Sequence, residues 1–249
     1  MSQSAAFQIH GVRVSVRTSD AAACDAIAEL LHAYLEANAG AAIARRAGIT
    51  VTLTAAAVDF LPRASPEPPL ISYGPVSGHR AGTGITLTDG WSQLQIDAQG
   101  RRIDGVTHRE SLRLPYVFAA VLFNLALQLA LRQHGLYYTH AAAVGDPSRP
   151  LLLVGNSGAG KTTLALALVR SGLPYLCDDA LFLCAPQDQP RVLPFRRPVH
   201  LDRGTSSCCH GVRGPGHRPI RSAAVACAGI SIPTPRFRGA WSSARRRQG

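Results

Sequence analysis

The sequence predicts an α/β protein in which a domain built around a glycine-rich loop follows a smaller α+β region. A short apolar run at 151–154 leads directly into a glycine-rich segment, and a helical pattern at 161–170 follows that segment. Upstream, residues 7–107 hold alternating apolar runs and one amphipathic stripe. With 249 residues, 46% hydrophobic and 16% charged, the chain is long and apolar enough to bury a core.

The first region, residues 1–110, is expected to combine strands with one helix. A strand at 7–17 places Val12, Val14 and Val16 on one face. A helix should begin after the capping residue Asp20, run to about Ala39 and end at Gly40. Later segments predict a strand at 49–54, a proline-rich loop at 62–75, and antiparallel strands at 83–88, 91–97 and 101–107, with Asp89-Gly90 as a hairpin turn.

The second region, residues 111–202, opens with an apolar helix at 114–134. Its uncharged stretch, Pro115 to Leu131, is shorter than the roughly 20 residues that a spanning helix needs, so we expect a buried helix and no membrane. Pro115 suits the first helical turn, and Gly135 suits the end. No basic, apolar leader opens the chain and no C-x-x-C pair occurs among the six cysteines, which together predict reduced thiols in the cytoplasm.

The positive charge is concentrated in the last segment. Residues 1–202 hold 16 Arg, one Lys and 15 acids, a sum of +2, whereas residues 203–249 hold nine Arg and no acid, a sum of +9. This distribution argues against specific nucleic-acid binding by the folded body. The abrupt loss of acids and of periodicity after Asp202 fits two interpretations equally: a basic, disordered tail, or a shift of reading frame in a GC-rich gene.

One motif carries most of the functional information. The pattern G-x-x-x-x-G-K-[ST] is met in full, followed by Thr163, in the run Gly155, Asn156, Ser157, Gly158, Ala159, Gly160, Lys161, Thr162. Its glycines let backbone N–H groups point at phosphate oxygens, and the next helix presents its positive end to them. Lys161 should reach the β- and γ-phosphates of ATP, and the Thr162 hydroxyl should bind Mg²⁺.

Residue usage supports the motif. The chain has 26 basic residues, and Lys161 is the one lysine among them. A compact ammonium fits between phosphates inside such a loop, whereas a planar guanidinium does not. Lysine is therefore kept where its shape matters.

Two aspartates follow at a distance that one helix and one turn fill. Asp178 and Asp179 should end a strand that lies beside the strand feeding the loop and runs parallel to it. A carboxylate at that edge can bind Mg²⁺ or accept a proton from an attacking hydroxyl. The alternative is a turn with two solvated acids.

These segments resemble the catalytic domain of HPr kinase/phosphorylase, whose phosphate loop has the architecture of the ATP-dependent phosphoenolpyruvate carboxykinases. The similar residues, within 137–201, are Thr139-His140-Ala141, Leu151 to Thr162, Gly172 and Cys177-Asp178-Asp179-Ala180. The resemblance implies an HPr-kinase-type P-loop core and a cytoplasmic, ATP-dependent serine kinase. It implies catalytic roles for His140, Lys161, Asp178 and Asp179, and Mg²⁺ binding by Thr162 and Asp178.

The chain also departs from that family. Residues 1–110 look more like divergent HPr-kinase-related proteins, and the family's downstream metal-binding glutamate has no counterpart, because no acid follows Asp202. We therefore do not expect the reverse phosphorylase reaction. A histidine on an apolar strand can be either structural or catalytic, so the residues alone favour neither role for His140.

Three functions remain open at this point. The first is a kinase that acts on a hydroxyl of a protein, peptide or small molecule. The second is a non-catalytic ATP-binding or truncated relative of such a kinase. The third is a generic P-loop ATPase or transport motor, which the short gap from Lys161 to Asp179 disfavours. The sequence specifies neither the acceptor nor whether the chain forms a homo-oligomer.

Overall fold

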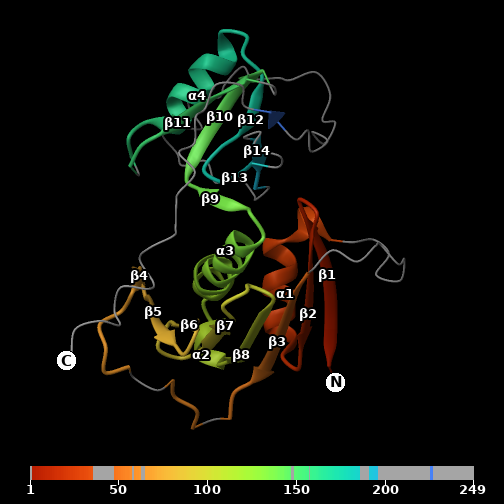
Figure 1. Cartoon of the computed structure of the whole chain (residues 1–249), viewed down its shortest axis with the longest axis vertical. Helices are drawn as coiled ribbons and strands as arrows, with labels where there is room; N and C mark the ends of the chain where they lie inside the picture. The colour runs from red at the N-terminus through yellow and green to blue at the C-terminus, as the bar shows by residue number, and fades with distance from the viewer. Residues whose placement is uncertain are drawn as a thin grey trace, which may run out of the picture.

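The computed structural model describes residues 2–35, 48–57, 59–62, 65–146, 149–156, 158–185, 191–195 and 225–226. Figure 1 shows two lobes: β1–β8 lie in the lower lobe with α1 and α3, and α4 flanks β10 and β11 at the top. The predicted mixture of helices and strands is confirmed. Of the segment 203–249, for which we expected either a disordered or a frame-shifted tail, all but residues 225–226 lie outside the described residues.

The lower lobe is built on a mixed sheet of eight strands. In spatial order these are β1 (Gln3–Ile9), β2 (Val12–Thr18), β3 (Ile49–Ala55), β8 (Arg102–Thr107), β7 (Gln93–Ile96), β6 (Gly84–Thr88), β5 (Val76–Ala81) and β4 (Ile71–Tyr73). The pairs β2–β3 and β3–β8 are parallel, and the other pairs are antiparallel. The strands predicted at 49–54, 83–88, 91–97 and 101–107 are thus present, whereas β4 and β5 were not predicted.

The single strand predicted at 7–17 was wrong, because the chain turns back within it. Residues His10 and Gly11, with φ of 46° and 90°, join β1 to β2 as a hairpin in which Ile9 pairs with Val12. Positive φ at both central residues is typical of the tight turns that match strand twist. The sequence signal was a change of phase: Phe7 and Ile9 occupy odd positions, and the valines of β2 occupy even ones.

Helix α1 begins where the sequence predicted and ends sooner. It spans Ala21–Leu30, and the Asp20 carboxylate accepts hydrogen bonds from the amides of Ala22 and Ala23 at 3.0 and 3.3 Å. A short 3₁₀ turn, η1 (His32–Tyr34), follows. The predicted end near Ala39 and Gly40 lies outside the described residues.

The apolar helix lies against the eight-stranded sheet. After α2 (Arg109–Leu112), it runs as a π-helical segment, η2 (Tyr116–Phe123), and continues as α3 (Asn124–Gln133) to Gly135, whose φ is 80°. Its buried side chains share one cluster with strand residues of β1–β8. Although Tyr116–Gln133 has the length and hydropathy to span a membrane, 56% of it is buried inside the protein. The helix that we assigned to the second region therefore packs on the first.

The upper lobe stacks a helix and two sheets. The central sheet has the order β11 (Arg149–Val154), β10 (Ala141–Asp146), β12 (Tyr175–Cys177), with helix α4 (Lys161–Arg170) on one face. The second sheet has the order β15 (Val225–Ala226), β14 (Arg191–Pro194), β13 (Leu181–Cys184), β9 (Tyr137–Thr139). Small residues alternate along β10: Ala142 and Val144 pack with Ala165 of α4, and Ala141 and Ala143 pack with β13 and β14. Both layers can therefore approach β10 closely.

Two strand predictions for this lobe were wrong in detail. The run 137–144 forms two strands in different sheets, with the break at His140. The aspartate strand β12 does not lie beside β11, because β10 lies between them and pairs antiparallel with both. Since β11 and β12 each run opposite to β10, they still point in the same direction. Apolar runs identify strands but do not specify which strands pair.

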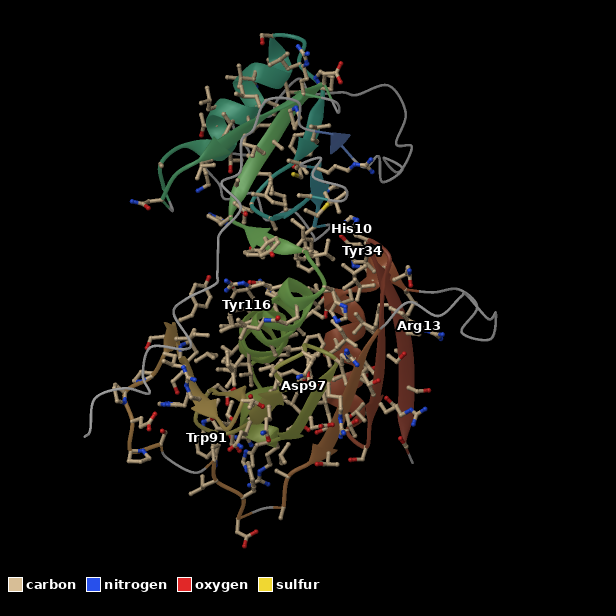
Figure 2. All side chains as sticks on the ribbon, viewed as in Figure 1. His10, Arg13, Tyr34, Trp91, Asp97 and Tyr116 are labelled. Atoms are coloured by element: carbon tan, nitrogen blue, oxygen red, sulfur yellow. The ribbon has the colours of Figure 1, made fainter. Side chains whose placement is uncertain are left out.

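Aromatic side chains join the lobes. The Pro194 carbonyl of β14 accepts hydrogen bonds from the Tyr34 hydroxyl at 3.0 Å and from His10 Nε2 at 2.9 Å. Rings of Phe182 and Phe195 pack edge to face, with centroids 5.1 Å apart, against this contact. Figure 2 labels His10 and Tyr34 where the lower lobe meets the upper one.

Candidate functional site

The glycine-rich loop between β11 and α4 adopts conformations that require its glycines. Gly158 and Gly160 have φ of 78° and 80°, in the left-handed region that side chains disfavour. A Cβ on Gly155 would lie 3.2 Å from the Cβ of Ala159, whose amide donates to the Asn156 carbonyl at 3.1 Å. The loop therefore folds back on itself; Ser157 lies outside the described residues.

Lys161 is buried at the mouth of this loop. It is 8% exposed, and its ammonium donates to the carbonyls of Gly155 and Asn156, each at 3.0 Å. In the described part of the chain, the hydrogen-bond partners of this ammonium group are backbone carbonyls, and none of them is a carboxylate that would neutralise its charge. A positive charge in this position is available to an anion that enters the loop.

Helix α4 contributes its N-terminal end to the same place. Gly160 is the N-cap and provides no side-chain hydrogen bond to the first turn. Its first residues include Thr162, which is half-buried, and Thr163, which is exposed. The amides of an uncapped first turn carry partial positive charge and suit a phosphate group.

Strand register brings the other candidate residues to this edge of the sheet. Ala141, which follows His140, pairs with Val154, which precedes the loop. On the other side of β10, Ala143 pairs with Cys177, which precedes the aspartates. His140, the loop and Asp178-Asp179 therefore meet at one edge of the three-stranded sheet, although 39 positions separate His140 from Asp179.

The aspartates form a tight turn. The Asp178 carbonyl accepts a hydrogen bond from the Ala180 amide at 2.7 Å, and Asp179 between them has φ of 63°. This γ-turn with positive φ is rare and strained for a side-chain-bearing residue, and such outliers cluster at functional sites. The Asp178 carboxylate accepts from the Asp179 amide at 3.0 Å, which holds the turn from inside. This strain was not predicted from the sequence, although the tolerance of aspartate for positive φ was an available signal.

His140 contacts the outer side of this turn. Its Nδ1–H donates to the Asp179 carbonyl at 2.8 Å, so a neutral ring leaves Nε2 as an acceptor. Nε2 lies 3.9 Å from Asp179 Oδ1, which is an ion pair only when the ring is protonated. Both side chains are solvent-accessible, at 46% and 56%. This exposed His–Asp pair differs from a histidine satisfied inside a core.

The remaining titratable groups on β12 stay neutral at physiological pH. Burial, opposed by a hydrogen bond from Ala143 and reinforced by the Asp178 charge, raises the pKa of Cys177 to about 12. Burial first, and then the Asp178 charge, also raises the pKa of Tyr175 above its usual value. The two aspartates are thus the ionisable groups that this strand end offers to a ligand.

Thr162 and Asp178 are the residues that we expected to bind Mg²⁺. Thr162 and Asp178 are oxygen donors at the same sheet edge, as a hard cation requires. Within the described ranges, no group of three or more His, Cys, Asp or Glu residues forms a metal-binding cluster. A cation held here would therefore complete its coordination with phosphate and water oxygens.

Comparison with protein-family models, curated proteins and solved structures finds no match to this chain.

Proposed function

We propose that this protein binds ATP with Mg²⁺ and transfers the γ-phosphoryl group to a hydroxyl of a protein, peptide or small molecule, as an HPr-kinase-like serine kinase does. One observation supports this above the others: the phosphate loop, His140 and the Asp178-Asp179 turn converge on one edge of a sheet. Ligands of α/β sheets bind at such an edge, outside the ends of the strands.

The loop supplies the phosphate site. Lys161 exchanges its two carbonyl partners for oxygens of the β- and γ-phosphates, while glycine amides and the start of α4 bind the remaining oxygens. Thr162 and Asp178 would hold Mg²⁺, which when bound neutralises phosphate charge. The position of Lys161, Thr162 and Asp178 at the same sheet edge supports this assignment.

The Asp179 carboxylate receives the acceptor's proton. The hydroxyl oxygen forms a bond to the γ-phosphorus, the bond from that phosphorus to the β,γ-bridging oxygen breaks, and ADP leaves. His140 fixes the turn through the Asp179 carbonyl, which keeps the carboxylate in position. We therefore assign Asp179 a catalytic role and His140 a positioning role.

A non-catalytic nucleotide-binding function is the second candidate. It is favoured by the absence of any acid in residues 203–249, where the resembling family supplies a further metal ligand. Both candidates require ATP binding at the loop, and they differ in turnover.

The single lysine makes a direct test of binding available. An acyl-phosphate derivative of ATP transfers its acyl group to an amine beside the bound phosphates, and here such an amine is Lys161 or the N-terminus. We expect acylation of Lys161, located by peptide mass spectrometry, and its suppression by excess ATP. Labelling of the N-terminus alone, unaffected by ATP, would refute the nucleotide site.

Turnover separates the two candidates. Release of inorganic phosphate from ATP, measured with and without Mg²⁺, reports phosphoryl transfer to water when the natural acceptor is absent. Slow Mg²⁺-dependent hydrolysis is expected from the kinase. Binding without any hydrolysis would assign the non-catalytic function instead.

A further inference from the structure

The lower lobe contains a cleft that the phosphate site does not use. Its volume is about 330 Å³, and its lining includes Asp59, Phe60, Trp91, His108, Arg109 and Glu110. Trp91 lies low in the lower lobe (Figure 2), whereas β11 and α4 lie at the top of the upper lobe (Figure 1). The volume suits a ligand with a single ring.

One wall is an open aromatic surface. The Trp91 indole stacks on the His108 imidazole, with ring centroids 5.4 Å apart and planes inclined by 19°. His108 covers part of the indole, yet Trp91 remains 44% exposed. A planar ring is the partner that such a surface favours.

His108 also offers a hydrogen-bond donor. It is 5% exposed, and its Nδ1 accepts from the Glu110 amide at 3.2 Å, so the hydrogen of a neutral ring lies on Nε2. Within the described ranges, Nε2 has no hydrogen-bond partner, and it is not sealed from solvent. The His108 amide donates to the buried Ser92 hydroxyl at 2.9 Å, which fixes the residue. A ligand carbonyl would satisfy this donor.

The charges of the cleft point to an uncharged ligand with an N–H group. The Glu110 carboxylate pairs with Arg113 at 2.7 Å and with Arg109 at 3.4 Å, so the charges of these three side chains largely offset one another. Asp59 has no ion-pair or hydrogen-bond partner in the part of the chain that the structure describes. Its carboxylate is an acceptor for a ligand N–H.

We propose that this cleft is a binding site for a planar ring that carries an amide group, either attached to the ring or within it. The ring stacks on Trp91, the amide carbonyl accepts from His108 Nε2, and the amide N–H donates to Asp59. Attached and cyclic amides share this chemistry, and benzamide and uracil are probes for the two forms. The proposal is independent of nucleotide binding in the upper lobe.

Fluorescence of Trp91 measures the binding. The chain has two tryptophans, and replacing the other one, Trp241→Phe, leaves Trp91 as the reporter. We expect benzamide or uracil to quench it saturably, and cyclohexanecarboxamide, which has the amide without a planar ring, to bind at least roughly tenfold more weakly, since stacking is lost. Benzoate, which has the ring with a negative charge, should also bind more weakly. Equal binding of all four probes, or of none, would overturn the proposal.

Variants of the lining test the contacts by saturation-transfer NMR. Trp91→Leu should weaken binding of the better probe by about tenfold. The matched control, Tyr73→Leu, replaces an aromatic residue that is 63% exposed outside the cleft and should leave binding unchanged. Unchanged binding in Trp91→Leu would contradict the site.

The polar contacts need separate variants. His108→Phe keeps a ring beneath Trp91 and removes the donor, so binding should fall; circular dichroism checks that this buried substitution folds. Asp59→Asn, on an exposed residue, removes the charge and should weaken binding by at least about threefold, as expected for a hydrogen bond to a charged group. Wild-type affinity in both variants would overturn the assignment, whereas Lys161→Ala should leave benzamide binding intact.

Discussion

His140 Nδ1 lies 2.8 Å from the backbone oxygen of Asp179, and this hydrogen bond ties the break between β9 and β10 to the break between β12 and β13. Both breaks fall at the edge of the sheet where the glycine-rich loop begins. His140, which directly precedes β10, therefore holds the conformation of the strained Asp178-Asp179 turn, which follows the neighbouring strand β12.

Replacement of Lys161 should abolish tight nucleotide binding. Lys161→Ala removes a charge-assisted hydrogen-bond donor, so ATP affinity in calorimetry should fall roughly 10- to 100-fold. Arg170→Ala, at the exposed far end of α4, is the control and should bind normally. Equal ATP affinity in Lys161→Ala and wild type would remove the basis of the proposed function.

The two aspartates should differ in effect. Asp179→Asn keeps a residue that tolerates positive φ but loses the proton acceptor, so ATP should still bind while phosphate release stops. Asp178→Asn should raise the Mg²⁺ concentration needed for half-maximal ATP hydrolysis, and it should reduce the rate of hydrolysis less than Asp179→Asn does. If Asp178→Asn instead abolished hydrolysis and Asp179→Asn did not, the roles of the pair would be reversed.

Loss of the His140 hydrogen bond should reduce turnover more than affinity. His140→Ala frees the Asp179 turn, so kcat for ATP hydrolysis should drop while the Kd for ATP stays near wild type. The free energy of unfolding should fall by about 1 kcal/mol, because one exposed hydrogen bond is lost. His134→Ala, which removes a 2.9 Å bond to the Gly100 carbonyl in the lower lobe, is the control for stability. A matching loss of turnover in both variants would argue against a positioning role.

Alkaline pH should destabilise the protein partly through Cys177. Burial raises the pKa of this thiol from 9.0 to about 12, so the folded state resists an ionisation that the unfolded state undergoes. The stabilisation is complete below pH 9 and is lost progressively as the pH rises toward 12. Between pH 8 and pH 11, the melting temperature should therefore fall less steeply with pH in Cys177→Ala than in the wild type. An equal fall of the melting temperature with pH in the two proteins would mean that the thiol is not buried as described. Tyr175, whose pKa is also raised, contributes equally to both proteins.

The junction of the lobes should contribute strongly to stability. Phe182 has no exposed surface and its ring contacts those of His10, Tyr138 and Phe195. Phe182→Ala should lower the free energy of unfolding by about 3–5 kcal/mol, measured by denaturant titration. Tyr137→Ala, on the neighbouring strand with a 46% exposed side chain, should have a much smaller effect. Similar losses would show that the cluster does not form a packed core.

Local pattern was sufficient where neighbouring residues alone decide the structure. Helix α4 occupies the predicted span, because its start is set by the glycine loop and its end by Gly172. The Asp20 cap and the strands of the sheet from β6 to β8 likewise follow from local residues. Strand phase could also have revealed the hairpin at His10-Gly11, since a two-residue turn shifts the alternation by one position.

Strand pairing and the meeting of distant side chains required the folded structure. The continuous apolar run from Ala141 to Val144 is typical of a strand buried on both faces, but it does not say that β10 separates β11 from β12. Likewise, His140 and Asp179, or Trp91 and His108, carry no signal of their contact, because each contact depends on how separate elements pack. The sequence by itself determined the glycine-rich loop and the position of its lysine, since a loop conformation depends on adjacent glycines. Only the tertiary structure decided which side chains face that loop, because register and packing act between segments far apart in the chain.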